Sequence, residues 1–151
     1  MRVFEDVPAF CAAVGEHLGD SDWVVIDQDR INLFADATGD HQWIHVDAER
    51  AAAGPFGSTI AHGFLTLSLV PVLMNEVFEV RNVALFMNYG SNKVRFLRPV
   101  PVGSRVQASV TLSGIDQAEL GVRASLHIEV RLADGGKPAC VAEMITLIVP
   151  A

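Results

Sequence analysis

A carboxylate and an imidazole, Asp40 and His45, stand five residues apart in a short polar stretch of the sequence. Groups of these two types transfer protons in many enzymes when a fold holds them in place. If the intervening Trp43 and Ile44 turn into the core, both side chains can reach one water molecule. The structural alternative is that Asp40 caps a turn and His45 is a partly buried, hydrogen-bonded histidine. The two residues taken alone favour neither interpretation.

The glycine at position 63 is a second candidate, because it follows His62 and leads into a long apolar segment. The first amides of a helix have no intrahelical partner, and a glycine lets a ligand oxygen approach them closely. Amides aimed at a carbonyl that gains negative charge form an oxyanion hole. Gly63 could instead relieve crowding where the helix enters the core.

The element that carries the carboxylate can be predicted from its two ends. Asp27 is a good N-cap, and apolar residues follow it at helical spacing, which predicts a helix over residues 28–38. Gly39 then supplies a left-handed C-terminal turn. Asp40 is therefore expected directly after the negative end of a helix dipole.

The rest of the chain predicts one helix enclosed by strands. Residues 64–78 are apolar on almost every face and predict a helix buried on all sides, too short to span a membrane. Residues 1–20 predict an additional amphipathic helix. Alternating or continuous apolar runs predict strands at residues 83–97, 105–112, 122–132 and 140–149, with a hairpin turn at residues 134–137. We expect a single α+β domain, residues 1–151, whose antiparallel sheet wraps around the long helix.

Composition limits the possible binding partners and the cellular location of the protein. The chain has 151 residues and a formal charge of −7, and no run of lysine or arginine occurs, so nucleic acids and anionic membranes are poor partners. The first residues lack the basic start and apolar core of a secretory signal, so a cytoplasmic location is expected. Cys11 and Cys140 lie far apart among apolar neighbours and predict buried free thiols.

Other chemistries have less support in the sequence. His41 and His45 have the i, i+4 spacing of a helical metal pair, but Gly39 breaks the helix and no third ligand has suitable spacing, so no metal site is expected. The Gly-x-Ser-x-Gly elbow, the P-loop and the dinucleotide-binding glycine pattern are all absent. Neither cysteine has a histidine nearby in the sequence, which argues against covalent acyl transfer.

Three blocks of sequence together resemble a known family. They read Thr-Gly-Asp-His-Gln-Trp-Ile-His at residues 38–45, Ala-His-Gly-Phe-Leu at residues 61–65, and Arg-Phe-Leu-Arg-Pro-Val-Pro-Val-Gly at residues 95–103. In this order they resemble the MaoC-like hydratases, the (R)-specific enoyl-CoA hydratases of hot-dog fold. Gln42 and Trp43 stand where Asn-Pro is usual in that family, a variant similar to its mycobacterial and nodulation-protein branch.

The resemblance implies reversible hydration of a trans-2-enoyl-CoA to the (R)-3-hydroxyacyl-CoA. Asp40 and His45 would be the catalytic pair and the Gly63 amide the oxyanion donor. No metal or redox cofactor is implied, since coenzyme A arrives as part of the substrate. A chain with one hot-dog repeat implies a homodimer. The candidate substrate-binding residues are Gln42, His62, Asn88, Lys93 and Arg95, of which the last three could instead form a solvated strand face or a dimer contact.

Three alternatives stay open. A hot-dog thioesterase would hydrolyse the thioester and release a free thiol. A hot-dog protein could bind acyl-CoA without turnover, although intact Asp40 and His45 argue against this. A purely structural dimer would bind no acyl-CoA.

Overall fold

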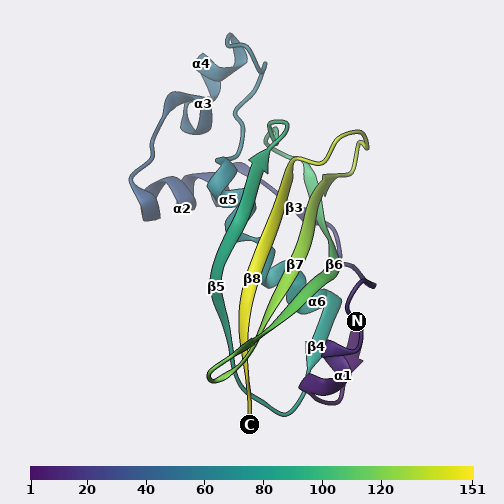
Figure 1. Ribbon diagram of the computed structural model, residues 1–151. Coiled ribbons are helices and arrows are strands. Elements are labelled where there is room, and N and C mark those ends of the chain that lie inside the picture. The colour runs from purple at the N-terminus through teal and green to yellow at the C-terminus, as the bar shows by residue number, and fades with distance from the viewer.

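An antiparallel sheet of long strands dominates the protein. The computed structural model describes residues 1–151, and its larger sheet has the strand order β2-β6-β7-β8-β5, with β3 also pairing with β6. The strands are β2 (His17–Asp20), β3 (Val24–Val25), β5 (Val83–Phe96), β6 (Arg105–Ala118), β7 (Gly121–Leu132) and β8 (Cys140–Pro150). Figure 1 shows these strands twisting together in front of the helices α5 (Gly63–Ser68) and α6 (Val70–Val77).

The central strands alternate as predicted. In β7 the even-numbered residues, from Val122 to Leu132, are all buried, and the intervening residues are half-buried or exposed. Apolar side chains of one parity therefore form the face that packs on the helices. The predicted strands and the α+β class are confirmed. Strand β6 continues beyond the predicted end at residue 112, because β6 and β7 pair as far as Ala118 and Gly121.

The predicted central helix is present but interrupted. Helix α5 ends at Ser68 and α6 begins at Val70, with Leu69 between them. Pro71 has no N–H to donate to the Leu67 carbonyl, so the regular bonding pattern cannot continue through this point. One side of both segments packs on the sheet, whereas Phe64 and Val72 expose 66% and 54% of their surface. In the single chain the helix is therefore not buried on all sides.

The N-terminal segment differs from the prediction. Only α1 (Val7–Cys11) is helical, and it lies between β1 (Arg2–Phe4) and β2. Strand β1 pairs in parallel with β4 (Phe78–Val80), directly after α6. The rings of Phe4, Phe10 and Phe78 contact one another at centroid distances of 5.2 and 5.4 Å. This aromatic cluster joins the N-terminal segment to Phe78, the residue that ends α6. Local periodicity could not predict this contact, because it joins segments far apart in the sequence.

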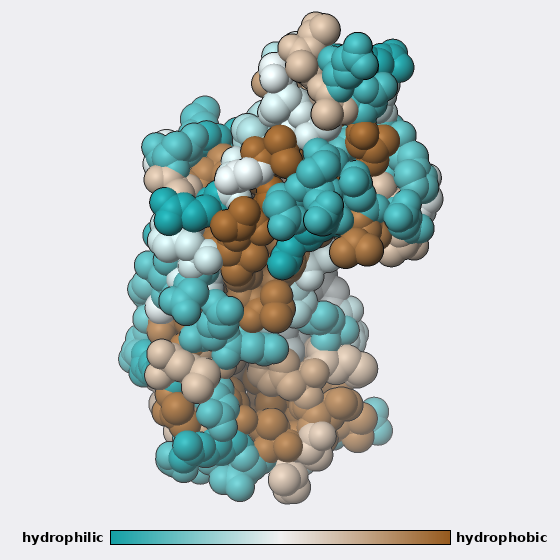
Figure 2. Space-filling model, turned by 180° about the vertical axis from the view of Figure 1, so that it is seen from behind, coloured by the Kyte–Doolittle hydropathy of each residue, from teal (hydrophilic) through white to brown (hydrophobic).

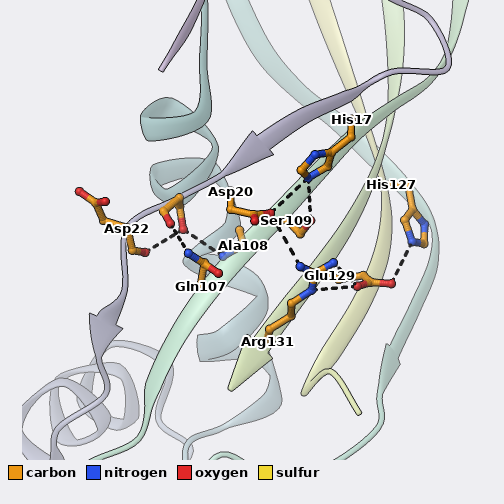
Figure 3. A network of polar contacts seen from close by, with 10 residues as sticks. His17, Asp20, Asp22, Gln107, Ala108, Ser109, His127, Glu129 and Arg131 are labelled. Atoms are coloured by element: carbon orange, nitrogen blue, oxygen red, sulfur yellow. Dashed lines mark hydrogen bonds and ion pairs between the residues drawn. The ribbon is translucent and has the colours of Figure 1, made fainter. Parts of the chain in front are cut away.

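Polar contacts fix β2 and the residues after it along the sheet (Figure 3). The buried Ser21 hydroxyl accepts from the Ala108 N–H at 3.0 Å, and the Gln107 side chain donates to the Ser21 carbonyl at 2.7 Å. Beside them His17 lies 3.0 Å from the Ser109 hydroxyl, and Arg131 lies 2.9 Å from Glu129. The exposed ion pairs add little stability, whereas the buried bonds of Ser21 fix the register.

The two cysteines are free, as predicted, but only Cys140 is buried, whereas Cys11 is half-buried. Burial raises the pKa of the Cys140 thiol to about 11, so this cysteine stays protonated and unreactive at neutral pH. No helix in the chain is long and apolar enough to cross a membrane.

Candidate active site

The loop that carries Asp40 is built as the sequence predicts. Helix α2 (Gln28–Thr38) begins at the N-cap Asp27, whose carboxylate accepts from the Arg30 N–H at 2.9 Å. Gly39 ends the helix with φ 79°, and its N–H donates to the Ala35 carbonyl at 2.8 Å. The left-handed conformation favours glycine here because other residues would be strained. Asp40 follows directly.

His45 lies on a separate short helix. Helices α3 (Trp43–Val46) and α4 (Ala48–Ala52) lie with α2 beyond one end of the sheet (Figure 1). The Trp43 ring packs against Gly54, where an added Cβ would lie 3.0 Å from it, and the Arg50 guanidinium lies 4.4 Å from the ring centroid. Trp43 thus holds α3 against α4 at the position where the family usually has proline.

The His45 side chain is buried and fixed in one tautomer. Its Nδ1 lies 2.7 Å from the Ile60 carbonyl oxygen, and the residue is 6% exposed. Because a carbonyl oxygen only accepts, Nδ1 carries the proton and the neutral ring keeps its lone pair on Nε2. Burial lowers the pKa of His45, and the nearby His62 lowers it further against the opposing effects of the Ile60 bond and Asp40. His45 is therefore a neutral base at physiological pH.

His62 joins the backbone of Asp40 to the ring of His45. Its Nε2 donates to the Asp40 carbonyl at 2.9 Å, and its ring stacks on that of His45 with centroids 3.8 Å apart. The Phe34 ring packs against the His62 ring, with centroids 4.9 Å apart. His62 is 3% exposed, and its Nδ1 is buried without a hydrogen-bond partner. Its side chain is thus enclosed by protein groups and does not line the cavity that His45 faces.

The Asp40 carboxylate lies at the exposed side of this cluster. One ligand atom from each of Asp40, His45 and His62 lies within 4.8 Å of the others. A water that hydrogen-bonds to two groups at about 2.8 Å each spans up to roughly 5.6 Å, so one water can bridge Asp40 and His45. The structure therefore brings together the carboxylate and imidazole that the sequence singled out.

The same three residues have donor atoms that suit a divalent cation, but their geometry does not. Imidazole lone pairs lie in the ring plane, and the planes of His45 and His62 are inclined by only 23°. The lone pairs of the two stacked rings therefore lie in nearly parallel, separate planes, so one ring would have to turn before both could point at one ion. His41, the other histidine of the i, i+4 pair, instead contacts Asp36 at 2.9 Å on the surface. The expectation of no metal cofactor stays a prediction.

A cavity of about 360 Å³ opens beside His45. Its lining residues are His45, Phe56, Ile60, Ala61, Gly63, Thr66, Phe96, Leu97, Arg98, Pro99, Val100 and Ala139. An added Cβ at Gly63 would lie 3.0 Å from the Phe96 ring, so the packing interpretation of this glycine has direct support. The N–H groups of Leu65 and Thr66 both donate to the His62 carbonyl, at 3.1 and 3.2 Å. The preceding amides at Gly63 and Phe64 have no such partner, as expected for a helix start.

The other predicted substrate-binding residues are scattered. Gln42 is exposed at the start of α3 and makes no side-chain capping bond. Asn88 lines a different cavity, of about 570 Å³, between α6, β4 and β5. Lys93 and Arg95 are exposed on β5, and neither lines the cavity at His45. In the single chain these four side chains are not gathered around Asp40 and His45.

Two residues that support the site were missed in the sequence. Gln28 donates from Nε2 to the His45 carbonyl at 2.8 Å, and Ile60 accepts from the His45 ring. Both contacts use backbone carbonyls, which every residue has, so no residue type marks them. A glutamine in the first turn of a helix is also an ordinary surface residue.

The chain is similar in sequence and in fold to known proteins. Residues 9–130 match the family described as MaoC like domain. The chain is 58% identical over 150 residues to the 3-hydroxyacyl-thioester dehydratase Z of Mycobacterium tuberculosis, covering 99% of each. It is 43% identical over 146 residues to nodulation protein N of Rhizobium leguminosarum bv. viciae, covering 95% of this chain and 89% of that protein. An R-hydratase structure from Pseudomonas aeruginosa aligns with TM-score 0.74 and 24% identity, covering 91% of this chain and 83% of that one.

Proposed function

Because this chain belongs to the MaoC-like dehydratase family, we propose that it reversibly hydrates trans-2-enoyl-CoA to (R)-3-hydroxyacyl-CoA. It is an enzyme with the hot-dog fold. The related protein from M. tuberculosis is named as a dehydratase of 3-hydroxyacyl thioesters, the reverse direction of the same reaction. The observation that carries the proposal is the neutral, buried His45, held within one water molecule's reach of Asp40 and lining a cavity.

The arrangement supports a mechanism with a single water. Nε2 of His45 takes a proton from the water while the water oxygen forms a bond to C3 and the electrons of the double bond move toward C2. The Asp40 carboxylate holds the second hydrogen of the water and balances the charge of the imidazolium. The imidazolium then gives its proton to C2 on the same face. Because burial disfavours the charged ring, the imidazolium is an effective acid for this step.

The thioester oxygen gains negative charge as the electrons move. The Gly63 amide, at the wall of the His45 cavity, is proposed to donate to this oxygen. No metal or redox cofactor takes part, because the thioester itself polarises the double bond. Coenzyme A enters as part of the substrate, and the exposed Lys93 and Arg95 remain candidates for contacts with its phosphates.

The acyl chain is proposed to follow one side of the central helix. Gly63, Leu67, Pro71 and Met74 recur at spacings of four, four and three residues and so share a face. Gly63 lines the cavity at His45, and Pro71 and Met74 line the larger cavity of about 570 Å³. At about 1.5 Å per residue, the second cavity begins roughly 12 Å from Gly63.

A second copy of the chain is proposed to cover the open edge. Strand β5 lies at the end of the strand order and exposes nearly all of its residues, and Phe64 and Val72 are exposed on the neighbouring helices. Figure 2 shows hydrophobic side chains in a band down the middle of the face behind the sheet. A long, apolar and unpaired edge is a site for pairing with another chain. We therefore propose a homodimer in which residues 1–151 of each subunit form one hot-dog domain. A cytoplasmic location is proposed separately, from the sequence expectation alone.

The proposal is tested with crotonyl-CoA and longer trans-2-enoyl-CoA substrates. Loss of the enoyl absorbance without release of free thiol supports hydration and excludes thioester hydrolysis. The product should be the (R) alcohol, so an (S)-specific 3-hydroxyacyl-CoA dehydrogenase should produce no NADH from it. Robust NADH formation would reject the stereochemistry. Binding of acyl-CoA without turnover would identify a binding protein instead.

A further inference from the structure

Gln28 lies outside the cavity at His45 and yet bonds to the backbone of that histidine. Its Nε2 donates to the His45 carbonyl at 2.8 Å. Its Oε1 accepts from the Thr59 hydroxyl at 2.5 Å. Thr59 is 2% exposed, so its hydroxyl has little access to water, and the bond fixes which end of the Gln28 amide points at His45.

The contact matters because the two catalytic residues belong to different helices. Asp40 follows the C-terminal end of α2, whereas His45 lies on α3, and the residues between the two helices form no regular element. Gln28 lies at the opposite end of α2 and reaches across to α3. It therefore links the helix that leads to Asp40 with the helix that carries His45.

Few other hydrogen bonds hold α3, although Trp43 packs against Gly54 and the His45 ring stacks on His62. Helix α3 lies beyond the end of the sheet and not on its packed face (Figure 1). The remaining bonds are those of the His45 ring to the Ile60 carbonyl and of the Ile60 N–H to the Ile44 carbonyl, at 2.7 and 3.0 Å. These bonds hold α3 to residue 60, and only Gln28 joins His45 to α2 through a hydrogen bond.

We infer that Gln28 is a positioning residue that sets the place of His45 relative to Asp40, oriented for this role by Thr59. The inference rests on the proposed function, since it assigns Gln28 to the same acid–base pair. A small displacement of a catalytic group, of the order of 1 Å, can lower a rate by roughly 100-fold. Gln28 therefore affects turnover more than substrate binding or folding.

The first test uses Gln28→Leu, which roughly keeps the size of the side chain and removes its three hydrogen bonds, to His45, Thr59 and Asn32. With crotonyl-CoA, kcat should fall by roughly 10- to 100-fold while KM changes less than about threefold. Thr59→Val should give a similar loss, and the double variant should be no worse than either single one. Asn32→Leu is the matched control, because Asn32 accepts the second N–H of the same amide at 2.9 Å and contacts neither His45 nor Thr59.

The second test uses Gln28→Glu and separates positioning from a general packing role. Only a protonated glutamate can donate to the His45 carbonyl while accepting from Thr59. The ratio of variant to wild-type kcat should therefore rise as the pH is lowered from 8 toward about 5, within the range where a glutamate begins to protonate.

A substrate-free measurement separates this inference from the proposed function. In the ¹⁵N-labelled protein, Gln28→Leu should shift the ring signals of His45, and Asn32→Leu should leave them unchanged. An inactive wild-type enzyme with this shift would reject the proposed reaction and keep the positioning role. A folded Gln28→Leu variant with wild-type kcat and unshifted His45 signals would overturn the inference. If Gln28→Leu does not fold, a pH-independent ratio for Gln28→Glu would overturn it.

Discussion

The imidazole rings of His45 and His62 stack with centroids 3.8 Å apart and planes inclined by 23°. Burial is the main cause of the lowered pKa of His45, and the adjacent His62 ring lowers this pKa further. His62 also donates to the Asp40 carbonyl at 2.9 Å. One buried residue thus contacts both members of the proposed catalytic pair: it stacks on the His45 ring and holds the Asp40 backbone beside it.

The pH dependence of activity follows from the direction of this shift. Because the pKa of His45 lies below its usual value near 6.5, the acid limb of the kcat/KM profile should also lie below 6.5.

The free energy of unfolding should also fall as the pH drops below about 6.5. Between the pKa of His45 in the folded chain and its usual value near 6.5, the unfolded chain binds a proton at His45 that the folded chain does not. The stability that depends on neutral His45 is therefore complete above about pH 6.5 and is lost as the pH falls toward the pKa of His45 in the folded chain. Urea unfolding at several pH values, compared with His45→Phe, measures this contribution; an unchanged pH dependence in the variant would contradict it.

Gly63→Ala should damage the site through Phe96. The new methyl group would lie 3.0 Å from the Phe96 ring, so the ring must move, at a cost of about 1–3 kcal/mol of stability. Activity should fall with it, although the amide is unchanged. Phe96→Ala in the same chain removes the clash and should restore much of the lost turnover. Continued inactivity of a folded double variant would mean that alanine disturbs the amide itself.

The proposed dimer can be tested on the exposed helix face. Val72→Arg places a charge on a residue that is 54% exposed in the single chain and should shift the sedimentation equilibrium toward monomer. Leu33→Arg is the control, since Leu33 is 70% exposed on α2, away from β5 and α6, and should leave the dimer intact. A wild-type chain that is an active monomer would reject the dimer.

Acyl chain length should affect kcat/KM. Three backbone bonds of an extended chain span roughly 3.6 Å, so an extended acyl chain advances about 1.2 Å per bond. About ten carbons therefore cover the roughly 12 Å from Gly63 to the larger cavity. Each buried methylene contributes up to about 0.8 kcal/mol, and kcat/KM should be higher for dodecenoyl-CoA than for crotonyl-CoA. Asn75→Trp, at a residue that lines the larger cavity, should lower the rate only for the longer substrate. Equal losses for both substrates would show that the tail lies elsewhere.

Local signals predicted the parts of the structure that depend on neighbours in sequence. The N-cap Asp27, the left-handed Gly39 and the alternation along β7 each act over a few residues, and all three appear as expected. The pairing of β1 with β4 was not predictable, because it joins segments more than seventy residues apart. The break at Leu69 follows from Pro71, a signal that was present but outweighed by the continuous apolar pattern.

The site shows the same division. Asp40, His45 and Gly63 were singled out because their residue types suit the proposed chemistry. The contacts that hold them, from Gln28 to the His45 carbonyl and from His62 to the Asp40 carbonyl, end on backbone atoms that any residue supplies. Asn88 was placed near the substrate by its type, and the structure puts it in the larger cavity along α6.

The most direct test of the account compares Asp40→Asn, His45→Ala and the double variant with the wild type. Each single change should lower kcat by roughly 10² to 10⁴, and circular dichroism must first show that the variants fold. Because both groups act on one water, the double variant should be little slower than the slower single variant. Folded single variants with near wild-type turnover, or losses that multiply in the double variant, would contradict the shared-water mechanism.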